Sequence, residues 1–155
     1  MAGILDGMRV VEGSAFVAIP LAGMTLAQMG ADVIRVERPG SDDFVRGHGG
    51  TPAMKEAGLG ASFLSQNSGK KSMVLDLKSA TGCAAFLDLA ATADIVTENF
   101  RPGVTERLGV DYVDVLLLGW VGVASSWRRS TEKALVELRE SGKARAIGVS
   151  IHDRP

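Results

Sequence analysis

Three segments of this chain combine basic and polar residues in a way that suits a phosphate-bearing ligand. They span residues 12–20, 67–72 and 98–103, and we expect them at the carboxyl ends of successive strands, where open α/β sheets bind ligands. With Arg38, the cations Lys70 and Arg101 would then meet near one crevice, and ammonium and guanidinium groups pair strongly with phosphate oxygens. The alternative is that all three are solvated loop charges, the commonest state of surface Lys and Arg.

Neither glycine-rich stretch matches a familiar nucleotide-binding motif. Gly13 is not followed by the further glycines of the dinucleotide fingerprint. Upstream of Gly69, Leu64 stands where a phosphate-binding loop of the Walker A type has its first glycine, and a strand rather than a helix is predicted to follow. Nicotinamide cofactors and nucleoside triphosphates are therefore weakly supported.

The elements that would position these segments alternate between strand and helix, which predicts an α/β fold with a mainly parallel sheet. About six strands are expected, over residues 8–12, 31–36, 72–75, 94–98, 113–118 and 144–150. Pro20 suits the first turn of a buried helix, and Gly30 suits its C-terminal cap. Residues 41–70 show no sustained period, and so long a loop is unusual in a compact domain, so we expect part of it to be helical or functional.

Composition restricts the class of protein. The chain is 46% hydrophobic and 23% charged with a net charge of −1, which favours a soluble globular protein and gives no basic excess for nucleic acid. The longest apolar stretch, residues 113–123, is too short to span a bilayer, and we expect neither membrane insertion nor a signal peptide. The single Cys83 fits a reducing cytoplasm, and the isolated His48 and His152 predict no metal site.

Several ordered motifs resemble the CoA-transferase family III, the CaiB/BaiF group that includes formyl-CoA transferases and α-methylacyl-CoA racemases. The similar stretches are Leu5–Glu12, Leu26–Glu37, Asn67–Lys78, Ala93–Gly103 and Leu108–Tyr112. The resemblance implies a Rossmann-like sheet with flanking helices over residues 1–112, with CoA or acyl-CoA as ligand.

The resemblance also implies which residues contact CoA: Val17, Arg38, Lys70, Asn99, Phe100 and Arg101. Lys70 and Arg101 would pair with the phosphates, and Arg38 or Phe100 would stack on adenine. Val17 would contribute a backbone contact.

The catalytic groups of the family are expected beyond residue 112. Its transferases use an aspartate nucleophile and its racemases a His and Asp pair. We match no residue to either, and we expect structural or solvated roles for Asp114 and Asp153. The chain by itself is therefore predicted to be inactive, and the catalytic residues are unknown.

The last third is similar instead to aldo/keto reductases. Asp111–Trp120 resembles a barrel strand that normally ends in a catalytic His, here Gly119, and Ala134–Ser150 resembles the following helix and strand. This predicts a chimera in which residues 113–155 complete or extend the same sheet as a strand–helix–strand unit.

Three functions follow: a CoA-binding protein of the transferase family, a non-catalytic remnant or interaction module, and an NADP-dependent reductase fragment. The third is disfavoured, because the catalytic tyrosine and lysine of the reductases are missing. Self-association is left open, with a homodimer as the expected form.

Overall fold

The computed structural model describes residues 3–40, 43–101, 103–121 and 129–151. The chain forms two compact units, residues 1–102 and 103–155. The division falls before the expected boundary at Tyr112.

The first unit alternates strands and helices. Its strands are β1 (Arg9–Gly13), β2 (Asp32–Glu37), β3 (Lys71–Val74) and β4 (Ile95–Glu98). Its helices are α1 (Ala18–Gln28), the 3-10 helix η1 (Phe44–Gly47), α2 (Pro52–Glu56), α3 (Ala61–Asn67) and α4 (Ala80–Ala90). The four predicted strands are confirmed to within two residues at each end, and so is the expectation of helix within residues 41–70.

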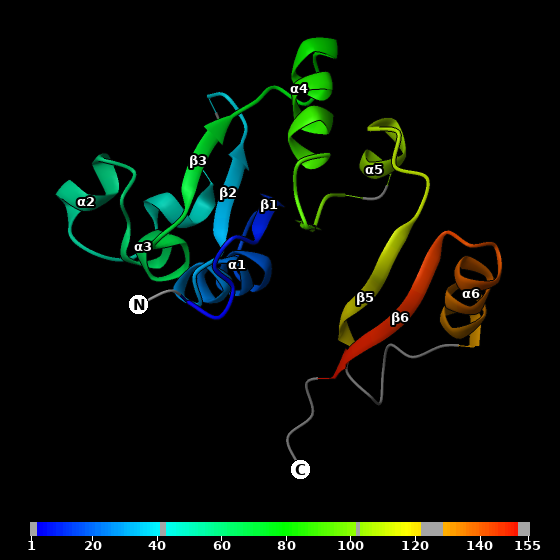
Figure 1. The fold of residues 1–155 in the computed structure, drawn as a ribbon. Helices are drawn as coiled ribbons and strands as arrows, with labels where there is room; N and C mark the ends of the chain where they lie inside the picture. Colours follow the sequence, from blue (N-terminus) through cyan, green and yellow to red (C-terminus); the bar gives the residue numbers. More distant parts are fainter. Residues whose placement is uncertain (1–2, 41–42, 102, 122–128, 152–155) are drawn as a thin grey trace. The chain divides into compact units, whose positions relative to one another are not determined.

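All four strands pair in parallel in the order β3-β2-β1-β4. Figure 1 shows β3, β2 and β1 of this sheet. The chain moves outward from β1 through β2 to β3 and then crosses back to pair β4 with the other side of β1. The topology therefore switches direction between β1 and β4, the point at which open parallel sheets bind ligands beyond the carboxyl ends of the strands.

One face of the sheet is apolar at the amino half of β1 and β2 and carries charged residues at the carboxyl half. At the amino half, Val10 and its register partner Val33 are buried with Leu26 of α1 packed against them. Two residues later the same face carries the register pair Glu12 and Arg35, both buried. The apolar half holds the sheet together, and the ionic half lies toward the carboxyl edge.

The helix α1 follows the predicted signals. Pro20 lies in its first turn, where a missing N–H costs no hydrogen bond. Gly30 follows the cap residue Met29 with a φ of 106°, a conformation that glycine adopts without strain.

The second unit contains α5 (Val104–Arg107), β5 (Val113–Val121), α6 (Arg129–Glu140) and β6 (Ala144–Ile151). Both predicted strands are present, and they pair in parallel with each other as a two-stranded sheet beside α6 (Figure 1). Leu135 of α6 is buried. The α/β class with a mainly parallel sheet is thus confirmed, but the six strands lie in sheets of four and two strands rather than in one.

Candidate functional site

The segments after β1, β2 and β4 lie at one edge of the four-stranded sheet, because these strands are parallel and adjacent. They contain five of the six predicted contacts and part of the basic charge: Val17 after β1, Arg38 after β2, and Asn99 to Arg101 after β4. The structure therefore brings these sequence-distant residues to the same edge.

Asn99 joins the β4 segment to the β1–α1 loop. Its side-chain oxygen accepts a hydrogen bond from the backbone N–H of Ala15 at 3.0 Å, and its Nδ2 donates to the carbonyl of Ala15 at 2.8 Å. A two-point contact of this kind fixes both the position and the orientation of the loop. It lies at the switch point between β1 and β4.

The loop that Asn99 holds leads directly into α1. Val17 is the N-cap residue, it is exposed, and no side chain caps the helix there. The first-turn N–H groups of an uncapped helix are donors suited to an anion.

Phe100 points into the protein rather than away from it. A Cβ on Gly13 would lie 2.5 Å from the Phe100 ring, and the ring makes an edge-on contact with Phe86 of α4 at 6.4 Å between centroids. The backbone N–H of Phe100 donates to Glu98 Oε2 at 2.6 Å. In this packing Phe100 supports the segment, while the neighbouring Arg101 is exposed.

Arg38 is exposed at the end of β2 and lines a shallow hollow of about 220 Å³. Glu37, Arg46 and Ser72 are also part of its lining. The hollow lies over the carboxyl ends of β2 and β3.

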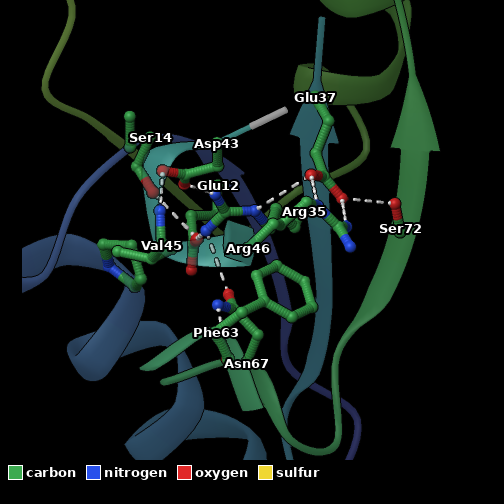
Figure 2. A network of polar contacts seen from close by, with 12 residues as sticks. Glu12, Ser14, Arg35, Glu37, Asp43, Val45, Arg46, Phe63, Asn67 and Ser72 are labelled. Carbon is green, nitrogen blue, oxygen red and sulfur yellow. Dashed lines mark hydrogen bonds and ion pairs between the residues drawn. The ribbon is translucent and has the colours of Figure 1, made fainter. Parts of the chain in front are cut away.

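Behind this edge lies a buried ionic network centred on Arg35, whose side chain occupies the middle of Figure 2. Arg35 Nη1 donates to Glu12 Oε1 at 3.0 Å and to Asn67 Oδ1 at 2.9 Å, and its Nη2 pairs with Asp43. The Ser14 hydroxyl donates to Glu12 at 2.8 Å, which connects the network to the β1–α1 loop. Three elements distant in sequence are thereby tied to β1.

Glu37 belongs to the outer part of the network. It accepts hydrogen bonds from Arg46 at 2.6 and 3.0 Å and from Ser72 at 2.8 Å (Figure 2). Burial alone would raise the pKa of Glu37, but the hydrogen bonds from Arg46 and Ser72 and the nearby positive charges hold it below the ordinary value. The Arg46 guanidinium also lies 3.7 Å from the centre of the Phe63 ring.

Lys70 is not at the carboxyl edge. The segment 67–70 precedes β3, so it enters the sheet from the opposite end, and its expected placement after a strand is wrong. Its side chain is 2% exposed, and Nζ donates to Glu12 at 2.7 Å, to the Pro20 carbonyl at 2.7 Å and to Asn67 at 2.9 Å. These bonds use all three ammonium hydrogens, so a phosphate contact would require one of them to break. Burial lowers the pKa of Lys70, and the hydrogen bond to Glu12 opposes that effect.

The sequence reasoning missed the acidic and basic partners in the strands, Glu12 and Arg35. Their signal was present, because each is a charged residue next to the apolar residues of a short strand, where charges are buried only when paired. It also missed Lys78, an exposed cation in the loop after β3, at the same edge as Arg38.

Within the four described ranges, no three His, Cys, Asp or Glu side chains are grouped so as to hold a metal ion. No helix in that part of the chain is long and apolar enough to cross a bilayer.

Comparison with known proteins decides the family. The model of CoA-transferase family III matches residues 5–117, well over half of the chain. The chain belongs to this family.

Curated relatives agree with this family assignment. A succinate–glutarate CoA-transferase of Agrobacterium fabrum is 42% identical over 119 residues, covering 74% of this chain and 29% of that protein. The succinyl-CoA–L-malate CoA-transferase alpha subunit of Chloroflexus aurantiacus is 36% identical over 138 residues, covering 89% of this chain and 29% of that protein. A probable fatty acyl-CoA transferase of Mycobacterium tuberculosis is 43% identical over 106 residues, covering 68% of this chain and 26% of that protein. The chain thus spans less than a third of the length of these relatives.

Solved structures of the family have the same fold. A hypothetical protein of M. tuberculosis matches with a TM-score of 0.61 and 32% identity, over 97% of this chain and 33% of that one. A CaiB/BaiF family protein of Brucella suis matches with a TM-score of 0.66 and 24% identity, over 95% of this chain and 53% of that one.

These similarities continue past the expected junction at Tyr112. The family model ends at Leu117, and a match to 138 of the 155 residues must run beyond residue 112. The comparisons therefore support CoA-transferase similarity into the last third and lend no support to a reductase chimera.

Proposed function

We propose that the chain binds CoA or acyl-CoA at the carboxyl edge of its four-stranded sheet, as the CoA-binding part of an enzyme that transfers CoA between carboxylic acids. The observation that carries the proposal is the pair of hydrogen bonds between Asn99 and Ala15. They join the two segments that flank the switch point, and the family assignment supplies the ligand.

Transfer is favoured over racemisation by the names of the relatives. The proteins of A. fabrum, C. aurantiacus and Mus musculus are all CoA-transferases, and the third is a succinyl-CoA:glutarate CoA-transferase at 37% identity. We carry that reaction class over to this chain as part of the proposal.

The proposed roles follow from exposure and charge. Arg38 and Arg101 are exposed cations at the edge, and Lys78 adds a third, so these three would pair with the phosphates of CoA. The uncapped N-terminus of α1 at Val17 would add backbone donors. Asn99 and Phe100 would act as positioning residues, because their side chains are engaged with Ala15 and with Gly13 and Phe86.

Lys70 takes a different proposed role from the one expected of it. Its ammonium is saturated by Glu12, Pro20 and Asn67, so we assign it to holding α1 and α3 against the sheet behind the ligand. A phosphate contact by Lys70 remains a prediction that the titration below also tests.

Isothermal titration of the chain with CoA tests the proposal. Arg101→Ala and Arg38→Ala should each weaken binding by about tenfold or more, the typical loss of a charge-assisted hydrogen bond. Lys70→Met in a folded sample should weaken binding less than Arg101→Ala does. Lys133→Ala, an exposed cation of α6, is the matched control and should leave the affinity unchanged. Absence of binding by the folded wild-type chain would reject the proposal and favour a non-catalytic interaction module.

Activity of this chain alone is a separate question. We assign the nucleophile to no residue, and we expect the 155-residue chain to show no CoA transfer when CoA esters are followed by liquid chromatography. Self-association and a location in the cytoplasm remain predictions, the first of which sedimentation velocity would measure.

A further inference from the structure

The backbone at Phe16, in the β1–α1 loop, is strained. Its φ is 74°, and among the described residues it is the one non-glycine residue with a positive φ. A bulky residue avoids this conformation, which persists only where the surroundings impose it. The Phe16 ring stacks on that of Phe44 at 5.8 Å between centroids but is 61% exposed, so its burial contributes little. The conformation is therefore held by contacts elsewhere in the loop.

The entry to the loop is anchored by Ser14. This residue is half-buried, and its hydroxyl donates to Glu12 Oε1 at 2.8 Å. The Glu12 carboxylate is fully buried and also accepts hydrogen bonds from Arg35 at 3.0 Å and from Lys70 at 2.7 Å. A hydrogen bond to a carboxylate is about twice as strong as one between neutral groups. Ser14 thus ties the loop to a group that the buried network fixes in place.

A second anchor follows one residue later. Ala15 exchanges two hydrogen bonds with the side chain of Asn99, at 3.0 and 2.8 Å. Helix α1 then begins at Ala18. Only Phe16 and Val17 lie between the anchors and the helix, so the turn of the chain into α1 falls on these two residues.

The two anchors connect the loop to different parts of the sheet. Asn99 ties it to the segment after β4, whereas Ser14 ties it to a carboxylate of β1 that is shared with β2 and with the segment before β3. Loss of one anchor leaves a strained residue with a single support, and strained backbone relaxes when what imposes it is removed. Relaxation at Phe16 would displace the adjoining Val17, which lies in the proposed CoA site.

We infer that Ser14 is a positioning residue for CoA binding: its hydrogen bond to Glu12 keeps Phe16 in the strained conformation that presents the start of α1 to the ligand. The inference rests on the proposed function, because it requires CoA to bind beside this loop. The Ser14 hydroxyl is itself directed to Glu12, so it acts through the loop rather than by contact with CoA.

Titration of Ser14 variants with CoA tests the inference. Ser14→Ala should weaken binding about tenfold, the size of one hydrogen bond to a charged group, while Ser14→Thr keeps the hydroxyl and should bind as the wild type does. Ser65→Ala removes an exposed hydroxyl bonded to a backbone carbonyl of α3, so it is the matched control and should not change the affinity. The melting temperature of Ser14→Ala should change little, because Arg35 and Lys70 still pair with Glu12.

A double-mutant cycle with Phe16→Gly separates positioning from a general loss of stability. Glycine adopts the positive φ without strain, so in the Phe16→Gly background the loop no longer depends on the Ser14 anchor. Ser14→Ala should therefore weaken CoA binding less in this background than in the wild type. An equal loss in both backgrounds would overturn the inference, as would wild-type affinity in Ser14→Ala or an equal loss in Ser14→Thr.

Hydrogen exchange of the Ala15 amide, followed by nuclear magnetic resonance, measures the same effect without a ligand. This N–H donates to Asn99 and is protected only while the loop keeps its position. Exchange should be faster in Ser14→Ala than in the wild type or in Ser65→Ala, and an unchanged rate would overturn the inference even if CoA binds. Failure of the folded wild-type chain to bind CoA would instead reject the proposed function, and with it the role of Ser14 in binding.

Discussion

The ammonium of Lys70 lies 2.7 Å from Glu12 Oε2, although 58 residues separate the two in sequence. Glu12 is fully buried and the Lys70 side chain is 2% exposed, so each charge depends on the other for compensation. Arg35 occupies the second carboxylate oxygen. The carboxylate of Glu12 therefore neutralises two buried cations and links β1 to β2 and to the segment before β3.

Removal of the Glu12 charge should destabilise the chain strongly. Glu12→Gln leaves Lys70 and Arg35 buried with one carboxylate fewer, and breaking a buried pair typically costs about 3–5 kcal/mol. Urea unfolding followed by circular dichroism measures the loss. Glu137→Gln, in the exposed pair with Lys133, is the control and should change the free energy of unfolding little. Lys70→Met should cost less in the Glu12→Gln background than in the wild type; additive losses would show that the two charges are not coupled.

Gly23→Ala should also lower stability. A Cβ at position 23 would lie 2.0 Å from Glu12 Oε2, so α1 approaches the ionic pair closely only because this residue has no side chain. The expected loss is about 1–3 kcal/mol, the usual cost of overpacking. Gly47→Ala is the matched control, since nothing lies within 4 Å of a Cβ there. Equal stability of the two variants in urea would contradict the close approach.

Asn99→Ala should weaken CoA binding without unfolding the protein. The variant loses both hydrogen bonds to Ala15, so the β1–α1 loop is no longer fixed at the switch point. We expect an affinity loss of about five- to tenfold by titration, within the range for one or two neutral hydrogen bonds. Asn99→Asp replaces the donor with a carboxylate oxygen facing the Ala15 carbonyl and adds a negative charge beside the proposed phosphate site, so it should weaken binding at least as much as Asn99→Ala. Thr92→Ala, before β4 at the opposite edge, should bind as the wild type does; an equal loss there would point to a general effect of substitution.

Acid should remove part of the stability through Glu37. The pKa of this carboxyl is lower in the folded chain than the ordinary 4.5, so the folded state favours its charged form. The stabilisation is complete above about pH 4.5 and is lost as the pH falls through the lower folded value. Asp32 acts in the same direction, because the hydrogen bond from Lys71 lowers its pKa. Unfolding free energies measured from pH 7 to pH 3 should therefore decline less steeply for Glu37→Gln, and an unchanged slope would rule out this contribution.

The sequence predicted the local elements well because their signals are local. Short runs rich in apolar residues, several of them next to glycine, marked all six strands, and Pro20 and Gly30 marked the limits of α1. The division of the strands between two sheets was not predictable in this way, since strand pairing depends on contacts between distant segments.

The candidate site likewise has features that the sequence predicted and features that it did not. Residue types and motifs sufficed to select Arg38, Asn99 and Arg101, which the parallel topology then brings to one edge. The same motifs selected Lys70 and Phe100 as ligand contacts, whereas the structure directs both side chains into the protein. A sequence motif identifies a segment, but the direction of each side chain is decided by what surrounds it.

By itself, then, the sequence determined an α/β chain of the CoA-transferase family with a strand–helix alternation that encodes its parallel sheet. Only the tertiary structure decided that Glu12, Arg35 and Lys70 form one buried network. It alone also decided that the rings of Phe16 and Phe44 stack on each other. The reason is physical. Periodicity and turn chemistry act over a few residues, whereas charge compensation and ring stacking act between segments that meet only after the chain has folded.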